Sequence, residues 1–230
     1  VISIGWEKTS VTNVDQINWE HVENSIVRST NTKEEQLFTN VIDQAKKERT
    51  TIGGVFQVIG FGIPLGLGDY IQWDNKLDGK IAQSMMSINA VKGVEIGNGF
   101  NNTEKYGNLV QDVIEPNSQD ERKFSQKTNH AGGLEGGMSN GNNIIVNVAV
   151  KPIATMTKPL PSVDIISGDI VEAAYNRSDI CQVARACPIG EAMLAITLTE
   201  VVLEKFGGDS IQEIKRNYKA YISSFKEYGK

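Results

Sequence analysis

The stretch TIGGVFQVIGF, at residues 51–61, begins a pattern that decides the fold class. Its β-branched and aromatic residues are typical of a strand, and GIPLGLGDY at residues 62–70 then interrupts it with glycines and a proline. Apolar residues recur every fourth position in the next segment, which predicts a helix. The inward face of that helix should carry Leu77, Ile81 and Met85. Because AVKGVEIG at residues 90–97 has the apolar character of a second strand, the order predicts a β-α-β unit.

A second β-α pattern starts with NNIIVNVAVKP at residues 142–152. Alternate positions are apolar, so one face of this predicted strand carries Ile144, Val146, Val148 and Val150. The strand should stop at Pro152, which cannot donate a hydrogen bond to a neighbouring strand. Further along, Pro188 is expected to be the first residue of a helix that ends at Gly207 and Gly208.

Two further helices are predicted, one near each end of the sequence. Residues 33–47 carry apolar side chains at fourfold spacing, and Thr32 with Glu35 forms a capping box before them. Ser210 and Glu213 cap a terminal helix in the same way. The apolar stripe of the terminal helix predicts a docking face, within the chain or between subunits, and consists of Ile211, Ile214, Tyr218, Ile222 and Phe225.

Length and composition exclude several classes of protein. The 230 residues, of which 40% are hydrophobic, are enough to bury a globular core. The net charge of −5 argues against a general electrostatic affinity for nucleic acid. No apolar run approaches the roughly 20 residues that cross a bilayer, so we expect a cytoplasmic protein with no membrane contact. Cys181 and Cys187 fit a reducing compartment. Their spacing matches no metal-binding motif, and the sequence has only His21 and His130 as further nitrogen ligands, so no metal site is predicted.

Three polar segments are candidates for a ligand site. NHAGGLEGGMSNG at residues 129–141 would let the backbone approach a flat or phosphorylated ligand, although a glycine-rich hairpin is the alternative. KPIAT at residues 151–155 ends the strand predicted at residues 142–152 with a cation and a hydroxyl, where sheets often present ligand groups; a plain surface lysine is the alternative. In RSD at residues 177–179, extended backbone would project Arg177 and Asp179 the same way, either to hold phosphate or as a simple ion pair.

In their order along the chain, these segments resemble chorismate synthase. The matching elements are SMMSINAVKGVEIG (residues 84–97), NHAGG with GGMSNG, KP before small and hydroxylated residues, and RSDIC followed by PIGEAM. The resemblance covers nearly the whole chain. It implies an α+β fold, a β-α-β sandwich built from repeated β-α-β units. Residues 1–230 would then form a single domain of this family that is incomplete at its N-terminus, with residues 98–129 as a long loop excursion near the active site.

The resemblance also implies an activity. Members of this family are lyases of the shikimate pathway of aromatic amino acid biosynthesis, and they convert 5-enolpyruvylshikimate 3-phosphate to chorismate and phosphate. This 1,4-elimination removes phosphate and one ring proton without net oxidation. It requires reduced FMN, which is thought to lend electron density to the departing C–O bond and to accept the proton near its N5. Some members also reduce the flavin with NADPH, others rely on outside reductants, and members assemble as homotetramers.

The family pattern implies roles for individual residues. Asp179 would act with flavin N5 in proton removal, and Arg177 would neutralise charge on cofactor and substrate, since a guanidinium binds phosphate through two parallel donors. Lys92 and Arg185 would add to the positive field. The implied FMN contacts are Asn89, Ala90, Gly136, Lys151, Pro152, Ile153, Ala154, Thr155 and Arg177.

Departures from the family pattern lie beside these residues. Ser178 stands where the family usually has His, Ile180 where Pro is common, and Glu135 where an apolar residue is usual. The family's N-terminal motifs, with their catalytic histidines, are not found, so neither His21 nor His130 takes a catalytic role. We therefore expect roughly the C-terminal two-thirds of a chorismate synthase. The alternative is a flavin- or phosphate-binding module, or an assembly fragment, without activity of its own.

Overall fold

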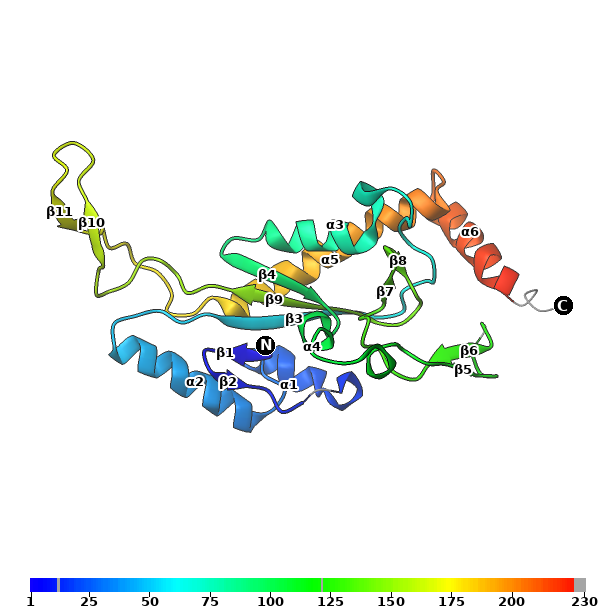
Figure 1. Ribbon diagram of the computed structural model, residues 1–230, viewed down its shortest axis with the longest axis horizontal. Coiled ribbons are helices and arrows are strands. Elements are labelled where there is room, and N and C mark those ends of the chain that lie inside the picture. The colour runs from blue at the N-terminus through cyan, green and yellow to red at the C-terminus, as the bar shows by residue number, and fades with distance from the viewer. Residues whose placement is uncertain (12, 121, 226–230) are drawn as a thin grey trace. The chain divides into compact units, whose positions relative to one another are not determined.

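The computed structural model describes residues 1–11, 13–120 and 122–225 (Figure 1). The chain divides into two compact units. Unit 1 consists of Val1–Gln57, Met86–Val94 and Asn147–Gly190. Unit 2 consists of Val58–Met85, Glu95–Val146 and Glu191–Lys230.

Short strands and six α-helices make up the described chain. The helices are α1 (Trp19–Asn24), α2 (Thr32–Lys47), α3 (Leu77–Met86), α4 (Gly99–Asn102), α5 (Val183–Phe206) and α6 (Ile211–Ser224), with 3-10 turns η1 (Val14–Gln16), η2 (Trp73–Asn75) and η3 (Gly107–Leu109). The strands are β1 (Ser3–Ile4), β2 (Glu7–Lys8), β3 (Gly54–Gly60), β4 (Val91–Ile96), β5 (Ile114–Pro116), β6 (Phe124–Gln126), β7 (Leu134–Glu135), β8 (Met138–Ser139), β9 (Ile144–Val150), β10 (Pro161–Val163) and β11 (Ile170–Glu172).

Five strands form the main sheet, in the order β2-β1-β3-β9-β4. Strand β1 pairs antiparallel with both neighbours, so that Ser3 lies opposite Lys8 on one side and Val55 on the other. Buried and half-buried positions alternate along β9, which confirms the predicted inward face of Ile144, Val146, Val148 and Val150. The predicted β-α-β unit is confirmed by β3, α3 and β4, and α3 buries Leu77, Ile81 and Met85 as expected.

Helix α2 lies where predicted, beside β1 and β2, but its cap differs (Figure 1). Asn31 is the N-cap, and its side-chain oxygen accepts the backbone N–H of Glu34 at 3.0 Å. The predicted capping box of Thr32 and Glu35 is therefore wrong by one residue. The reason is that Asn31 has extended backbone and a short acceptor, whereas Thr32 is already helical. The buried face of α2 consists of Glu34, Phe38, Val41 and Ala45.

Helix α5 starts earlier than predicted. It begins at Val183, so Pro188 lies inside the helix and not at its first position. Val183, Ala186 and Cys187 are all buried. Their burial favours helical backbone ahead of the proline, although the helix then lacks the hydrogen bond that residue 188 would donate.

Helix α5 also has the length and composition of a bilayer-spanning helix. It has 24 residues, its most apolar window has a mean hydropathy of 1.6, and 33% of that window is buried. It is the one helix within the described ranges that meets this test, which core helices of globular proteins also meet. The prediction that no segment is long and apolar enough to cross a bilayer is therefore wrong for α5. Scattered polar residues interrupt its apolar run without lowering its mean hydropathy much.

The end of α5 and the start of α6 agree with the prediction. Gly207 and Gly208 follow α5 with φ of 53° and 103°, left-handed conformations that suit glycine. The Ser210 side chain caps α6 by accepting the N–H of Glu213. In the predicted stripe, Phe225 is buried while Ile211 stays exposed, and Phe225 packs edge-on against the ring of Tyr221.

Candidate functional site

Two of the predicted cofactor segments meet at the edge of β4 in unit 1. The backbone N–H of Lys151, just after β9, donates to the carbonyl of Ala90 at 2.9 Å, just before β4. Ala90 has a φ of 67°, which is uncommon for a residue with a Cβ and costs free energy. Backbone strain of this kind is concentrated at functional sites. The strain here lies at one of the predicted flavin contacts.

The residues just before β3 hold the other segments of the site. The Thr51 hydroxyl donates to the carbonyl of Ile153 at 2.6 Å. The next residue, Ile52, donates its N–H to the carbonyl of Ile180 at 2.9 Å. A Cβ on Gly53 would stand 2.3 Å from the carbonyl oxygen of Val150, so only glycine permits this approach. Residues 51–53 thus link segment 151–155 to segment 177–180. No sequence motif indicated this role.

A pair of hydroxyls joins those two segments directly. Thr155 Oγ1 donates to Ser178 Oγ at 2.9 Å. Ser178 Oγ in turn donates to the backbone carbonyl of Thr155 at 3.0 Å. Both side chains are half-buried. The link joins positions 23 residues apart, and no local sequence signal announces it.

The acid of the site is paired with a different arginine from the one expected. Arg185 Nη1 donates to Asp179 Oδ2 at 2.7 Å. The exposed fraction of the side chain is 77% for Arg185 and 44% for Asp179, so the pair faces solvent. Within the described ranges Arg177 forms no ion pair, and the simple Arg177–Asp179 pair considered from spacing is not present. The reason is that α5 starts early enough to bring Arg185 back over Asp179.

The remaining predicted residues of unit 1 are accessible. Lys151 and Arg177 are exposed, and neither side chain has a hydrogen-bond or ionic partner among the residues that the structure describes. Lys92 is exposed as well. The exposed or half-buried flavin-contact candidates around these cations are Asn89, Ala90, Pro152, Ile153, Ala154 and Thr155. The structure therefore brings all candidates except Gly136 into one hydrogen-bonded cluster of segments.

Cys181 and Cys187 are not joined in a disulfide bond. Burial raises the pKa of the Cys181 thiol, and the nearby charge of Asp179 raises it further. The thiolate is the reactive form of cysteine, so both effects make Cys181 a poor nucleophile at neutral pH.

Gly136 belongs to unit 2, where it lies between β7 and β8 with a φ of 62°. The glycine-rich segment around it is held by a carboxylate that the sequence did not single out. Asp112 accepts the backbone N–H groups of His130 and Ala131 at 2.8 and 2.9 Å, and the hydroxyl of Thr128. Burial opposes ionisation of Asp112, but these hydrogen bonds outweigh it and lower the pKa of that carboxyl. Residues 98–129 thus supply an anchor for the glycine-rich segment.

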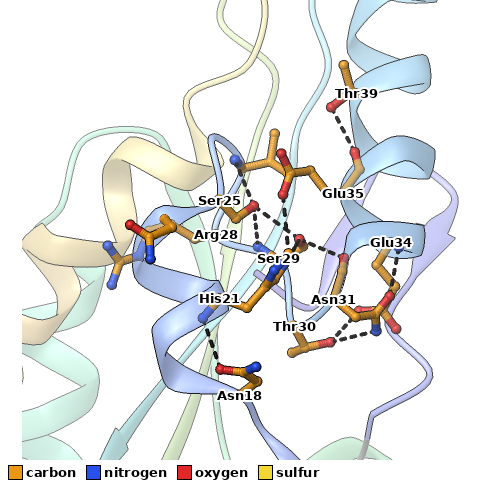
Figure 2. Close-up of polar contacts among 12 residues, drawn as sticks. Asn18, His21, Ser25, Arg28, Ser29, Thr30, Asn31, Glu34, Glu35 and Thr39 are labelled. Atoms are coloured by element: carbon orange, nitrogen blue, oxygen red, sulfur yellow. Dashed lines mark hydrogen bonds and ion pairs between the residues drawn. The ribbon is translucent and has the colours of Figure 1, made fainter.

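A polar cluster between α1 and α2 has the residue types of a catalytic triad but not its geometry. Figure 2 shows Ser29, His21 and Glu35 within this cluster. Both Ser29 Oγ and Glu35 Oε2 lie 3.5 Å from the same nitrogen, Nε2 of His21, whereas a triad uses the two ring nitrogens separately. Ser29 is also fully buried, so no substrate reaches its hydroxyl. The cluster is structural.

The chain is similar to known proteins over most of its length. A sequence profile of the family described as chorismate synthase matches residues 2–203. A chorismate synthase from Desulforudis audaxviator is 51% identical over 185 residues, covering 80% of this chain and 47% of the relative. One from Koribacter versatilis is 41% identical over 237 aligned positions, covering 99% of this chain and 60% of the relative. The chain spans about half to three-fifths of the length of these relatives.

The fold leads to the same family. A crystal structure of chorismate synthase superimposes with a TM-score of 0.82 at 36% identity, covering 99% of this chain and 62% of that one. The likeness confirms the predicted α+β fold of this family. The chain belongs to the chorismate synthase family.

Proposed function

We propose that the protein converts 5-enolpyruvylshikimate 3-phosphate to chorismate and phosphate with reduced FMN, as a lyase of aromatic amino acid biosynthesis. In this reaction the C–O bond to phosphate and one ring C–H bond break, and the phosphate leaves with the C–O electron pair. One observation carries the proposal: the segments at residues 89–90, 151–155 and 177–180 are tied together in unit 1, directly or through residues 51–52.

The groups on these segments fit a flavin mononucleotide. Its phosphate needs cations, and Lys151 and Arg177 offer exposed, unpaired ones within the described chain. Its ring system needs a flat apolar surface, which Pro152 and Ile153 can supply. When bound, the reduced flavin would supply electron density to the departing C–O bond.

Asp179 would hold the proton that leaves the ring. Its Oδ2 is occupied by Arg185, whereas Oδ1 accepts no hydrogen bond from any residue that the structure describes. Oδ1 is therefore the atom we assign to proton transfer. Arg177, two residues away, would neutralise phosphate charge on the cofactor or the departing group.

The proposal extends to location, assembly and the source of the reducing electrons, on the strength of family membership alone. We propose a cytoplasmic homotetramer that acts on a small molecule, with no nucleic acid or membrane partner. Reduction of the flavin by NADPH, in the protein itself or through an outside reductase, belongs to the same proposal.

The test is an anaerobic assay. The protein is mixed with reduced FMN and 5-enolpyruvylshikimate 3-phosphate, and chorismate and inorganic phosphate are quantified by chromatography. We expect equal amounts of both products, no consumption of reductant per turnover, and quenching of flavin fluorescence in a separate titration with FMN. FMN binding without either product would favour the flavin-binding module, and absence of both binding and products would leave an assembly role.

A further inference from the structure

One hydroxyl group joins the two segments that carry the proposed site. Ser178 Oγ accepts the hydroxyl of Thr155 at 2.9 Å and donates to the carbonyl of the same residue at 3.0 Å. Its donor and one acceptor position are thus both used on a single partner. No other side-chain hydrogen bond joins residues 151–155 to residues 177–179 in the part of the chain that the structure describes.

Ser178 lies between Arg177 and Asp179, so its hydrogen bonds affect how both charged side chains are oriented. Arg177 and Asp179 are exposed whereas Ser178 is half-buried, an alternation typical of extended backbone. When the Ser178 side chain is fixed on the inner side, the side chains before and after it must project outward. The orientation of both therefore depends on the hydroxyl between them.

The other attachments of this segment hold its far end. Ile180 is bound through its carbonyl to the N–H of Ile52, and Asp179 is bound to Arg185. Residues 173–179 form no helix or strand. Before Ser178, the nearest residue with a backbone hydrogen bond to another segment is Ala173, whose N–H donates to the carbonyl of Leu160. Without the Ser178 link, no hydrogen bond among the described residues would hold the chain between Ala173 and Asp179.

We infer that Ser178 is a positioning residue of the proposed site: its hydroxyl, locked on Thr155, sets the direction in which Arg177 and Asp179 present their charges. The inference rests on the proposed function. It assigns to Ser178 no contact with substrate or cofactor.

The chain offers a matched control for removing this hydroxyl. Ser29 lies 3.1 Å from the hydroxyl of Ser25 and donates to the carbonyl of Asn31 at 3.1 Å, so it too is bonded to one hydroxyl and one backbone carbonyl within unit 1, although on two partners (Figure 2). Because Ser29 is fully buried, Ser29→Ala should destabilise the protein at least as much as Ser178→Ala does. It touches none of the proposed site segments.

The experiment compares Ser178→Ala, Ser178→Thr and Ser29→Ala in the full protein. Misplacement of reacting groups by about 1 Å costs up to roughly a hundredfold in rate, so we expect Ser178→Ala to lower kcat about tenfold or more. The Kd for FMN, from fluorescence titration, should rise by a smaller factor than kcat falls, because Lys151 still offers its cation to the phosphate when Arg177 is misdirected. Ser178→Thr keeps the hydroxyl and should recover most of kcat.

A second measurement is independent of turnover. Hydrogen exchange of the ligand-free protein should be faster at residues 177–179 in Ser178→Ala, and unchanged there in Ser29→Ala. The inference is overturned if Ser178→Ala leaves kcat and local exchange as they were, or if Ser29→Ala lowers kcat equally. If the unaltered protein makes no chorismate, the proposed function fails instead, and the exchange data still decide whether Ser178 orders this segment.

Discussion

Asp179 is bound by Arg185, six residues further along the chain, and not by its near neighbour Arg177. The 2.7 Å contact between Nη1 and Oδ2 comes from the first turn of α5. A cation in that turn interacts unfavourably with the positive end of the helix, and the Asp179 carboxylate offsets this. The two arginines therefore differ in role: Arg185 fixes the Asp179 carboxylate, while Arg177 remains available to bind an anionic ligand.

Asp179→Asn should abolish most turnover while flavin binding persists. The amide is nearly the same size but cannot take a proton at neutral pH, so we expect kcat to fall by roughly a hundredfold or more. The Kd for FMN should change little, because the phosphate is held by cations. Parallel measurements of chorismate formation and flavin fluorescence check this. Unchanged turnover would remove Asp179 from the mechanism and favour the binding module.

Arg185→Gln should affect activity more than stability. An ion pair this exposed stabilises the fold by about 1 kcal/mol or less, so thermal unfolding should shift by no more than about 4 °C. Loss of the anchor on Oδ2 should lower kcat about fivefold, and Arg185→Lys should recover part of it. The control is Lys80→Gln, which removes the ion pairs to Glu200 and Glu204 at 3.2 and 3.6 Å in unit 2. Equal kcat losses in both variants would contradict the prediction.

Gly53→Ala should destabilise the protein because the added methyl has no space. It would meet the carbonyl oxygen of Val150 at 2.3 Å and the Cδ of Pro152 at 3.0 Å, and the first of these is backbone that cannot rotate away. Overpacking of this kind costs about 1–3 kcal/mol, which urea unfolding would measure. Flavin affinity should fall as well, because Pro152 belongs to the proposed cofactor segment.

Gly107→Ala is the control for that substitution. A Cβ at Gly107 would have nothing within 4 Å. The free energy of unfolding should therefore stay within about 0.5 kcal/mol of the original value or rise slightly, since alanine restricts the unfolded chain. If both glycine variants were equally stable, the close approach at Gly53 would not constrain the site.

Glu34 should make stability depend on pH in the acid range. Its exposed fraction is 3%, yet the hydroxyls of Thr30, Thr9 and Ser10 and the N–H of Ser10 outweigh the effect of burial and lower its pKa from 4.5 to about 2. Because the folded-state pKa is depressed, the carboxylate stabilises the fold above about pH 4.5, and this contribution is lost as the pH falls toward 2. A shift of this size corresponds to about 3 kcal/mol.

Glu34→Gln tests this directly. Chemical unfolding at several pH values should show the original protein to be more stable than the variant at pH 6. The difference in the free energy of unfolding should shrink as the pH falls from about 4.5 toward 2. Glu35→Gln, a change to the next residue of the same helix, provides the control. If the stability difference between the original protein and Glu34→Gln stayed constant between pH 6 and pH 2.5, the hydrogen bonds from the neighbouring hydroxyls would not favour the ionised form of Glu34.

Local patterns predicted much of this fold. The alternation from Ile144 to Val150 and the fourfold spacing of Leu77, Ile81 and Met85 identified the buried faces, because side-chain direction follows from backbone period alone. Errors arose where two local signals competed. Pro188 resembled a first helical residue, yet the buried side chains before it extend α5 back to Val183.

What the sequence by itself determined is the three longest strands (β3, β4 and β9), the four helices α2, α3, α5 and α6, and the motifs that mark the chorismate synthase family, since all of these depend on residues close together along the chain. What only the tertiary structure decided is which side chains meet. Arg185 binds Asp179, Ser178 closes on Thr155, and Gly53 lets β9 approach. The last two of these contacts join residues 23 or more positions apart, so they form only where the folded chain returns to itself.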